Sequence, residues 1–537
     1  MLHRTNGPRR RALALLLGAL AIASLVLTTA VAQSDLAEEQ VIRYATDGRQ
    51  FPPLDPSLGA NNISFPVQNM IFDSLVRFPP GSPRLDAIEP ALAESWEASE
   101  NGSVWTFRLR QGVQFHRGYG ELTSADVAFS LERAMGEGSV VAGSYSNIES
   151  IETPDPYTVV FRLADPDAFF LTGLANKYGG WIVSQAALED MGQDAYSLRP
   201  IGSGPFMVED VVPGEVLHLV RHDGYWRGQP IIERVEYLLM PDLTARTLAL
   251  INGEVDVIRG AVSPEWSATV TNAGMNLGFS APGQFILMFN MEVEPFDDPR
   301  VRQAFAYAIG RDAVMAFYGD TAIPMYTNVP PYVMGALTAE ELPEPLRYER
   351  DVERARALLA EAGFPNGLEI DALASENPDY NNPLQIWKEL WADAGIMVNY
   401  TAVDHPTYHA RIRSEPHALI PYGGVRAPHP NDWLGAWYTS TGGLNFSHYG
   451  QMDADGDGMV ESIDEYVAAA RATLDPEAQQ AAWTAAQLQL LEDMPTFPSH
   501  VVKIAFALRP EVDLGYELES TVVDGVEIWE TTRLLDR

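Results

Sequence analysis

Alternating hydrophobic and polar residues predict β-strands at several places in the chain. Within residues 101–110, an Asn-Gly turn leads into a stretch that places Trp105, Phe107 and Leu109 on one face and polar residues on the other. Residues 41–45 predict a further strand near the start of the chain. Another alternating stretch begins after an Asp-Pro pair, and its apolar face consists of Tyr157, Val159, Phe161 and Leu163.

Start and stop signals for helices lie between these strands. Residues 123–126 have the Thr-x-x-Asp pattern of a capping box. Asp298 followed by Pro299 is typical of an N-cap and the first helical position. A third helix is expected over residues 352–362, and it should stop at Gly363. Because strands and helices alternate along the chain, we expect an α/β fold with mixed sheets.

The length of the chain, 537 residues, exceeds what one hydrophobic core can hold, so two or three lobes are expected. A hydrophobic fraction of 46% is enough to fill sizeable cores. The formal net charge of −37 argues against nucleic acid and anionic membranes as partners. The chain has no cysteine, which excludes disulfides, thiolate metal sites and a thiol nucleophile.

The first 32 residues have the three parts of a secretory signal peptide. Four arginines precede an uncharged apolar run over residues 12–27, and residues 30–32, Ala-Val-Ala, give a small-x-small cleavage pattern. The alternative, a membrane anchor, fits less well because the run is short for a span. We expect cleavage near Ala32 and no lipid anchor, which predicts a protein that diffuses freely in the periplasm.

A set of short segments follows in a defined order along the rest of the chain. They are residues 91–97, 107–110, 113–116, 124–130, 201–206, 225–228, 289–290, 295–296, 298–308, 355–367 and 491–495. In this order they resemble the bacterial extracellular solute-binding proteins that serve ABC importers for dipeptides, oligopeptides and nickel.

The resemblance implies a periplasmic-binding-protein-like α/β fold with two hinged lobes, mixed sheets and an extra lobe. Lobe I would comprise residues 33–66, 199–284 and 503–537, lobe II residues 67–198, and lobe III residues 285–502. Two or more chain crossings between lobes I and III would form a hinge, and closure would trap a solute. The resemblance further implies a monomer that carries out no catalysis and delivers its solute to the permease subunits of an ABC transporter.

The same resemblance points to one stretch of lobe III as a ligand contact. In the family's peptide binders, a Trp-x-x-Asp-x-x-Asp-Pro stretch supplies an Asp that pairs with the α-ammonium group of the ligand. Here Tyr422 takes the Trp position, Val425 or Arg426 that of the anchoring Asp, and His429 that of the second Asp. The ammonium anchor is therefore missing, and Arg426 would favour a carboxylate or a neutral polyol.

Three more residues complete the expected ligand contacts: Asp432 and Trp433 in the same stretch, and Asn62 in lobe I. Trp433, Arg426 and Asn62 each have an alternative interpretation. Trp433 and Trp437 lie four residues apart and could form a packed helical face. Arg426 could point to solvent, and Asn62 could serve only a turn.

Two other functions fit the sequence less completely. An oligosaccharide-binding protein of the same fold would differ only in its ligand. A secreted hydrolase would need a nucleophile and a base, yet the chain has no H-E-x-x-H, G-x-S-x-G or Walker motif. Ser499 and His500 are adjacent, which does not by itself define a catalytic pair.

An acidic stretch, residues 453–464, fits a twelve-residue EF-hand-type calcium loop. Gly458 stands at position six, where the backbone must turn, and Val460 at position eight should point inward. The expected ligands are Asp453, Asp455, Asp457, the Met459 carbonyl, Glu461 and Asp464. The alternative is a plain acidic turn. We expect a structural Ca²⁺ here and no cofactor for chemistry.

Overall fold

The computed structural model describes residues 36–59, 61, 63–81, 87–175, 180–424, 429–453, 458–518 and 525–536. The expected signal peptide, residues 1–32, lies outside these ranges. Among the helices within them, none combines the length and the apolar character that a membrane span needs.

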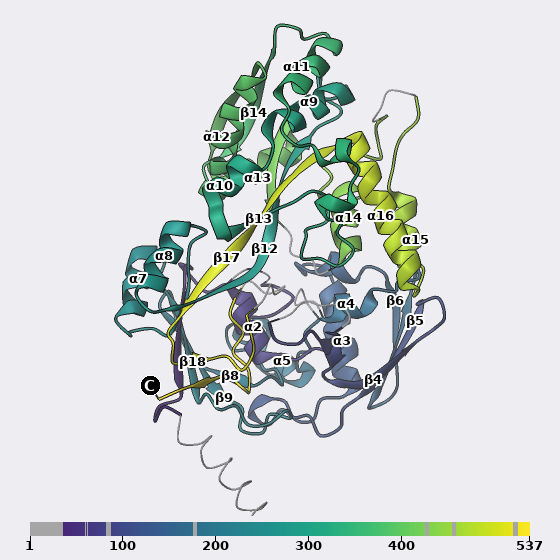
Figure 1. The fold of residues 1–537 in the computed structure, drawn as a ribbon. Helices are drawn as coiled ribbons and strands as arrows, with labels where there is room; N and C mark the ends of the chain where they lie inside the picture. Colours follow the sequence, from purple (N-terminus) through teal and green to yellow (C-terminus); the bar gives the residue numbers. More distant parts are fainter. Residues whose placement is uncertain are drawn as a thin grey trace, which may run out of the picture.

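A nine-stranded mixed sheet runs through the described part of the chain (Figure 1). Its order is β16 (Leu419–Gly424), β12 (Asn276–Phe289), β17 (Thr496–Leu508), β11 (Val257–Arg259), β1 (Val41–Thr46), β10 (Arg234–Leu239), β9 (Val216–Arg221) and β8 (Phe206–Val212), with β13 (Ala322–Pro324) on β17. Strand β1 pairs in parallel with β10 and β11, whereas the other neighbours are antiparallel. This sheet confirms the expected mixed α/β class, and the strand expected over residues 41–45 is β1.

Two long strands, β12 and β17, connect the lower and upper parts of the molecule in Figure 1. They pair in antiparallel fashion from Asn276 with Leu508 at one end to Met288 with Thr496 at the other. Their register shifts between residues 280 and 283, where a bulge locally bends a strand. The expected limits between lobes I and III fall within these two strands; the lobe limits themselves stay a prediction.

A four-stranded antiparallel sheet lies in the range predicted for lobe II. Its order is β4 (Ala93–Ala98), β5 (Val104–Leu109), β7 (Thr158–Leu163) and β6 (Ile148–Asp155). The two alternating stretches are β5 and β7, and Trp105, Phe107 and Leu109 are buried as expected. Helix α3 (Ser124–Met135) packs on β6 and β7 and begins with the predicted capping box of Thr123 and Asp126.

The other two expected helices lie in the range predicted for lobe III. Helix α9 (Pro299–Ile309) is capped by Asp298, and α11 (Val352–Glu361) ends just before Gly363, which has a positive φ of 98°. A β-α-β unit follows them, because α12 (Pro378–Asp393) joins the parallel strands β14 (Leu368–Ser375) and β15 (Ile396–Val403).

The remaining elements are short or lie around these sheets. The helices are α2 (Ser64–Ile71), α4 (Phe170–Ala175), α5 (Gln185–Met191), α6 (Gln193–Leu198), α7 (Leu243–Ile251), α8 (Pro264–Asn272), α10 (Asp312–Tyr318), α13 (His405–Ser414), α14 (Pro430–Tyr438), α15 (Asp464–Arg471) and α16 (Pro476–Asp493). The short strands are β2 (Val76–Arg77), β3 (Glu89–Pro90), β18 (Val512–Asp513) and β19 (Arg533–Leu534). The 3₁₀ turns are η2 (His116–Gly118), η3 (Ala142–Tyr145), η4 (Gly319–Thr321), η5 (Ala339–Glu341) and η6 (Glu344–Arg347).

Two large hydrophobic clusters hold the described residues together. One draws on residues 42–257 and 504–534, and the other on residues 285–497. The first cluster therefore contains both predicted lobe I and predicted lobe II, whereas lobe III has a core of its own. A smaller cluster packs α7 and α8 against the sheet near β1 and β11.

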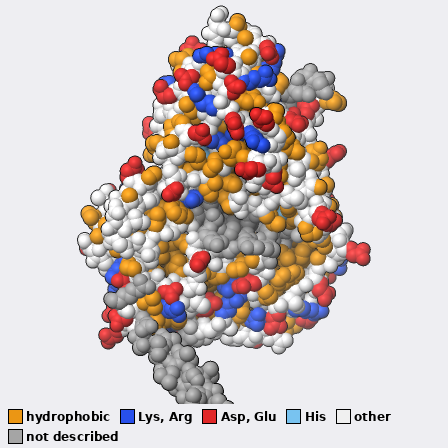
Figure 2. Space-filling model, viewed as in Figure 1, with side chains coloured by type: hydrophobic (Ala, Val, Ile, Leu, Met, Phe, Trp, Pro, Cys, Tyr) orange, Lys and Arg blue, Asp and Glu red, His pale blue; other side chains and the backbone are white. Residues whose placement is uncertain are grey.

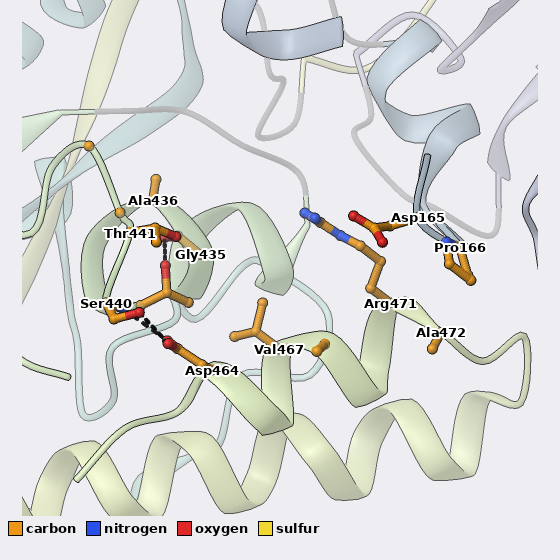
Figure 3. A pocket seen from close by; sticks show the side chains of 14 residues that line it. Asp165, Pro166, Gly435, Ala436, Ser440, Thr441, Asp464, Val467, Arg471 and Ala472 are labelled. Carbon is orange, nitrogen blue, oxygen red and sulfur yellow. Dashed lines mark hydrogen bonds between the residues drawn. The ribbon is translucent and has the colours of Figure 1, made fainter. Parts of the chain in front are cut away.

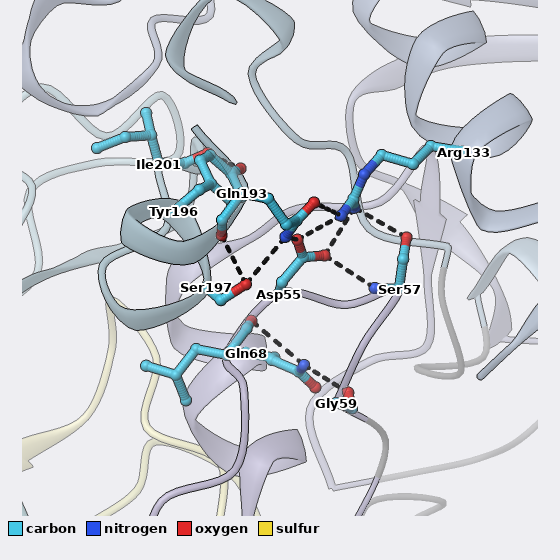
Figure 4. Close-up of polar contacts among 10 residues, drawn as sticks. Asp55, Ser57, Gly59, Gln68, Arg133, Gln193, Tyr196, Ser197 and Ile201 are labelled. Atoms are coloured by element: carbon cyan, nitrogen blue, oxygen red, sulfur yellow. Dashed lines mark hydrogen bonds and ion pairs between the residues drawn. The ribbon is translucent and has the colours of Figure 1, made fainter. Parts of the chain in front are cut away.

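A buried ion pair fixes the Pro-rich segment that follows β1 (Figure 4). Asp55 is fully buried, and Arg133 of α3 donates to both of its carboxylate oxygens, at 2.7 and 2.5 Å. Gln193 donates to the same carboxylate at 2.8 Å. Gln68 of α2 donates to the carbonyl of Gly59 at 2.7 Å. These bonds tie residues 54–59 of lobe I to helices α2, α3 and α6.

Removal of the Asp55 carboxylate should destabilise the protein strongly. In Asp55→Ala, Arg133 loses its buried partner, and breaking such a pair lowers the free energy of unfolding by about 3–5 kcal/mol. Chemical denaturation would measure the loss. The matched control is Glu152→Ala, which removes an ion pair with Arg162 whose side chains are 49% and 48% exposed. The control should lose less than about 1 kcal/mol, and equal losses in both variants would contradict the prediction.

Candidate functional site

Hydrophobic side chains gather on both sides of the junction between the upper and lower parts of the molecule (Figure 2). In Figure 1 this junction lies below α14 and the crossing strands β12 and β17 and above α2 and α4. It is the boundary between lobe III and the body that contains lobes I and II, which have separate hydrophobic cores. Of the expected ligand contacts, Tyr422 lies on strand β16, His429 caps helix α14, and Asp432 and Trp433 lie on α14.

Tyr422 lies on β16 within an aromatic cluster. Its ring centroid is 5.2 Å from that of Trp437, 5.4 Å from that of Phe446 and 5.4 Å from that of His409. Its hydroxyl accepts a hydrogen bond from Arg413 Nη2 at 3.2 Å. Among the described residues, no carboxylate bonds to Tyr422. The described residues therefore place a cation and no carboxylate beside Tyr422, which is the opposite of an ammonium anchor.

His429 has a structural position that sequence reasoning did not foresee. It is fully buried, and its Nδ1 accepts the N–H of Asn431, which caps α14. The ring of Phe169, from lobe II, lies 3.5 Å away between centroids, and Trp483 lies 5.2 Å away. Burial lowers the pKa of His429 well below its usual value, so the ring is neutral. In this structure His429 is therefore a buried helix cap, and its expected ligand contact stays a prediction.

Trp433 also belongs to the core of lobe III. It is fully buried, and its ring centroid lies 6.3 Å from that of Trp437, one helical turn later. The pair packs as the helical-face alternative describes, because α14 directs these positions, with Leu434, toward the hydrophobic cluster of lobe III. The expected ligand contact of Trp433 stays a prediction.

A second contact joins lobes II and III, away from the crossing strands. The N–H of Ala168 donates to the carbonyl of Arg471 at 2.9 Å, and the Asp167 carboxylate lies 3.9 Å from Arg471 Nε. The next residue, Phe169, packs on His429 and on Trp483. Lobe III is thus joined to the rest of the molecule at two places. Strands β12 and β17 join it to lobe I, and the segment of residues 167–169 joins it to lobe II.

Asp432 stands in the first turn of α14, close to that contact. The residue reaches the surface, and the protein around its carboxylate removes part of the hydration of that group. Desolvation by this surrounding protein, with the Asp167 carboxylate, raises the pKa of Asp432 to about 7, and Arg471 opposes the shift. An acid that is partly protonated at neutral pH is a poor partner for an ammonium group.

A cavity of about 680 Å³ lies beside the contact of lobes II and III (Figure 3). Asp165 and Pro166 of lobe II form one side, and helices α14 and α15 form the other. Asp464, an expected calcium ligand, stands at its edge. Its carboxylate accepts the backbone N–H of Ser440 at 2.9 Å and also the Ser440 hydroxyl. In this structure Asp464 therefore stabilises the turn after α14.

The rest of the acidic loop is only partly described. Asp455 and Asp457 lie outside the described residues, whereas the Asp453 carboxylate accepts the N–H of Gly458 at 2.7 Å. Val460 is 54% exposed, which corrects the expectation that it points inward. Between the end of α14 and residue 453, the described chain contains no helix that would enter the loop. Within the described ranges, no three His, Asp or Glu side chains are grouped as a metal site.

The remaining site residues divide between those that lie outside the described part and those that sequence reasoning missed. Arg426 and Asn62 fall outside it, so their expected ligand contacts stay predictions. Phe169, Arg413 and Arg471 were missed. No motif in the sequence marks these three residues. Only the folded chain shows that Phe169 and Arg471 lie where lobes II and III meet and that Arg413 lies beside Tyr422.

Ser499 and His500 do not form an accessible catalytic pair. The Ser499 hydroxyl lies 3.0 Å from His500 Nδ1, but both residues are fully buried in β17. Burial lowers the pKa of His500 to about 3. A substrate has no access to either group in this structure.

Comparison with known proteins now places the chain. Residues 87–445, well over half of its length, match the bacterial extracellular solute-binding proteins, family 5, middle region. The chain belongs to this family. The family consists of proteins that bind solutes for transport, and the hinged α/β lobes agree with its fold.

Relatives within this solute-binding family span nearly the whole chain. The dipeptide-binding protein of Escherichia coli K12 is 26% identical over 527 residues, which cover 92% of this chain and 95% of that protein. Heme-binding protein A of Haemophilus influenzae is 29% identical over 394 residues, covering 67% and 69%. The structure of MoaA from A. tumefaciens R10 in complex with mannopinic acid has a TM-score of 0.77 at 29% identity, covering 93% and 100%.

The raised pKa of Asp432 predicts how the stability of this solute-binding protein depends on pH. The folded chain keeps the Asp432 proton up to about pH 7, whereas the unfolded chain loses it near pH 4. The stability contributed by the protonated form is therefore lost as pH rises between these values. Asp432→Asn should melt at a higher temperature than the wild type at pH 8, and the difference should shrink toward pH 4.

Asp298→Asn serves as the control of opposite sign. Hydrogen bonds from Arg300 lower the pKa of Asp298, so its contribution is present at neutral pH and is lost on acidification. This variant should melt below the wild type at pH 8. A difference for Asp432→Asn that does not change between pH 4 and pH 8 would contradict the assignment.

Proposed function

We propose that the protein is the periplasmic solute-binding component of an ABC importer and that it releases its solute unchanged. Family membership supports the transport role, and the signal-peptide pattern of residues 1–32 supports export. The separate cores of lobe III and of the body that contains lobes I and II, joined by β12 and β17, support capture by closure. The protein would act as a monomer with its permease subunits, and its net charge of −37 supports the absence of nucleic-acid partners.

We further propose that the solute carries a carboxylate and lacks the free α-ammonium group of a simple dipeptide. The observation that carries this proposal is the chemistry around Tyr422. Val425 and Arg426 stand where an anchoring Asp is expected, and Arg413 bonds to the Tyr422 hydroxyl. Arginine pairs with carboxylates in a bidentate geometry and repels ammonium groups. Mannopinic acid and heme, named for two of the relatives, both carry carboxylates.

An oligosaccharide is the second candidate solute. The partly exposed Phe446 ring beside Tyr422 supports it, because sugar rings pack on aromatic side chains. A sugar would use the arginines as hydrogen-bond donors and would need no counter-charge.

A panel of solutes tests the proposal. Unmodified dipeptides, the same dipeptides acetylated at the N-terminus, mannopinic acid and neutral oligosaccharides are each added before thermal unfolding. Mannopinic acid or the acetylated dipeptides should raise the melting temperature, since a ligand at 100 times its Kd adds about 2.7 kcal/mol. Solution scattering should then show a smaller radius of gyration.

Each outcome separates one part of the proposal. Tighter binding of free than of acetylated dipeptides would contradict the solute class. A tightly bound solute that leaves the scattering curve unchanged would contradict closure. Chemical conversion of a bound solute, detected by mass spectrometry, would contradict a role in binding alone.

We also propose that residues 453–464 bind one structural Ca²⁺. The spacing of Asp453, Asp455 and Asp457 supports this, because carboxylates so close together repel each other unless a cation joins them. Asp464 already accepts two hydrogen bonds from Ser440, so it would contribute at most one oxygen. The ion would join the loop to the start of α15.

Chelation tests the calcium site. Added Ca²⁺ should raise the melting temperature of the chelated wild type and leave that of an Asp453→Ala, Asp457→Ala double variant unchanged. Both proteins are measured without solute, so the result does not depend on the ligand. If calcium stabilises both proteins equally, or neither, residues 453–464 are only a turn.

A further inference from the structure

Two histidines on one face of α13 direct ring nitrogens at each other. His405 is the first residue of the helix, and His409 follows one turn later. Their Nε2 atoms lie 3.2 Å apart, and their ring planes are inclined by 80° with centroids separated by 4.5 Å. Both side chains are partly buried, and the His409 ring packs edge-on against Tyr422 of β16, with 5.4 Å between centroids.

The separation of the two nitrogens matches that of two ligands on one metal ion. Imidazole nitrogens bind Zn²⁺ at about 2.0–2.1 Å, which in a tetrahedral site places two of them about 3.3 Å apart. Residues four apart on a helix are neighbours on its surface, so one helical turn can supply both ligands. His405 and His409 have that spacing and that distance.

Contacts outside the pair fix the orientation of His405. Its Nδ1 lies 2.9 Å from the hydroxyl of Ser375, and that hydroxyl also accepts the N–H of Asn377 at 3.1 Å. The ring of Tyr380 packs edge-on against His405 and His409, at 4.8 and 5.8 Å between centroids. Ligating histidines are commonly held in this way through their second nitrogen.

The charge state of the pair also suits a metal ion. Burial, with His405 and Arg413 nearby, lowers the pKa of His409 to about 4. Burial likewise lowers the pKa of His405, against the opposing effect of the Asp379 carboxylate. Neutral rings keep the lone pairs that a metal needs, and no proton has to leave at pH 7.

We propose that His405 and His409 form a two-imidazole site for a divalent late transition-metal ion such as Zn²⁺, Ni²⁺ or Cu²⁺. Nitrogen ligands select these ions over Ca²⁺ and Mg²⁺, which prefer oxygen. Two protein ligands leave further coordination positions for water or for a solute. A bound ion would join the first two turns of α13. The alternative arrangement at this distance is a single N–H···N hydrogen bond between the rings.

Metal titration without a histidine tag tests the site. Zn²⁺ binding is measured by calorimetry in excess Ca²⁺, which saturates residues 453–464, and no solute is added. The wild type should bind Zn²⁺ tightly. His405→Ala and His409→Ala should each weaken binding by more than about 100-fold, because loss of a ligand costs more than loss of a residue that only supports a ligand. Ser375→Ala should weaken binding by about tenfold. His218→Ala, on β9, is the matched control and should leave the affinity unchanged.

Cu²⁺ spectroscopy gives a second readout that folding defects do not imitate. The electron paramagnetic resonance spectrum of the wild type should show coupling to two nitrogens, and each single variant should show one or none. Apo melting temperatures check that the variants fold. Absence of tight Zn²⁺ binding, or equal binding in all variants, would leave only the hydrogen-bonded pair and overturn the proposal. Because no solute is present, neither result depends on the proposed transport function.

Discussion

The antiparallel pairing of β12 with β17 is the constraint on which the rest of the structure depends. Both strands run without a break from the sheet of lobe I into lobe III, so the hydrogen-bonded ladder that builds the two parts also connects them. A ladder of this kind resists sliding but can twist and bend at a bulge. The register shift between residues 280 and 283 places such a point where β12 leaves lobe I. Any closing movement must therefore rotate lobe III about this ribbon, and the contact of residues 167–169 with α15 and α16 limits how far it turns.

Much of this fold could be predicted from the sequence because its signals are local. The faces of β5 and β7 follow from period-two alternation, and α3 and α9 begin at side chains that cap their first turn. The partners of the long strands could not be predicted in this way. β12 contacts β16 and β17, which come much later in the chain, and nothing within residues 276–289 identifies them.

The candidate site was harder to predict because a polar side chain looks the same in sequence whatever it bonds to. His429 matched a ligand position by alignment, but the folded chain uses it as a cap beneath Phe169. Asp464 matched the last ligand of a calcium loop, but it also bonds to Ser440. Trp433 and Trp437 had the spacing of a packed face, and that simpler interpretation is correct. For Trp433 and Trp437, the helical spacing thus predicted their location in the structure better than the suitability of an aromatic ring for contact with a ligand.

The charge of the chain constrains how an anionic solute could be held. With 73 acids against 36 lysines and arginines, the protein repels anions at long range. Salt screens this repulsion beyond about 8 Å at physiological ionic strength. The repulsion therefore slows the approach of an anion more than it lowers the affinity of an anion that is already bound. Around the expected ligand contacts, the balance of positive and negative charge depends on individual residues. Arg413 bonds to Tyr422, and Arg471 lies near Asp432. The raised pKa of Asp432 removes part of its negative charge at neutral pH. Affinity for a carboxylate must therefore come from short-range, desolvated contacts with individual arginines. Closure of the lobes, which excludes water, is the step that would strengthen them.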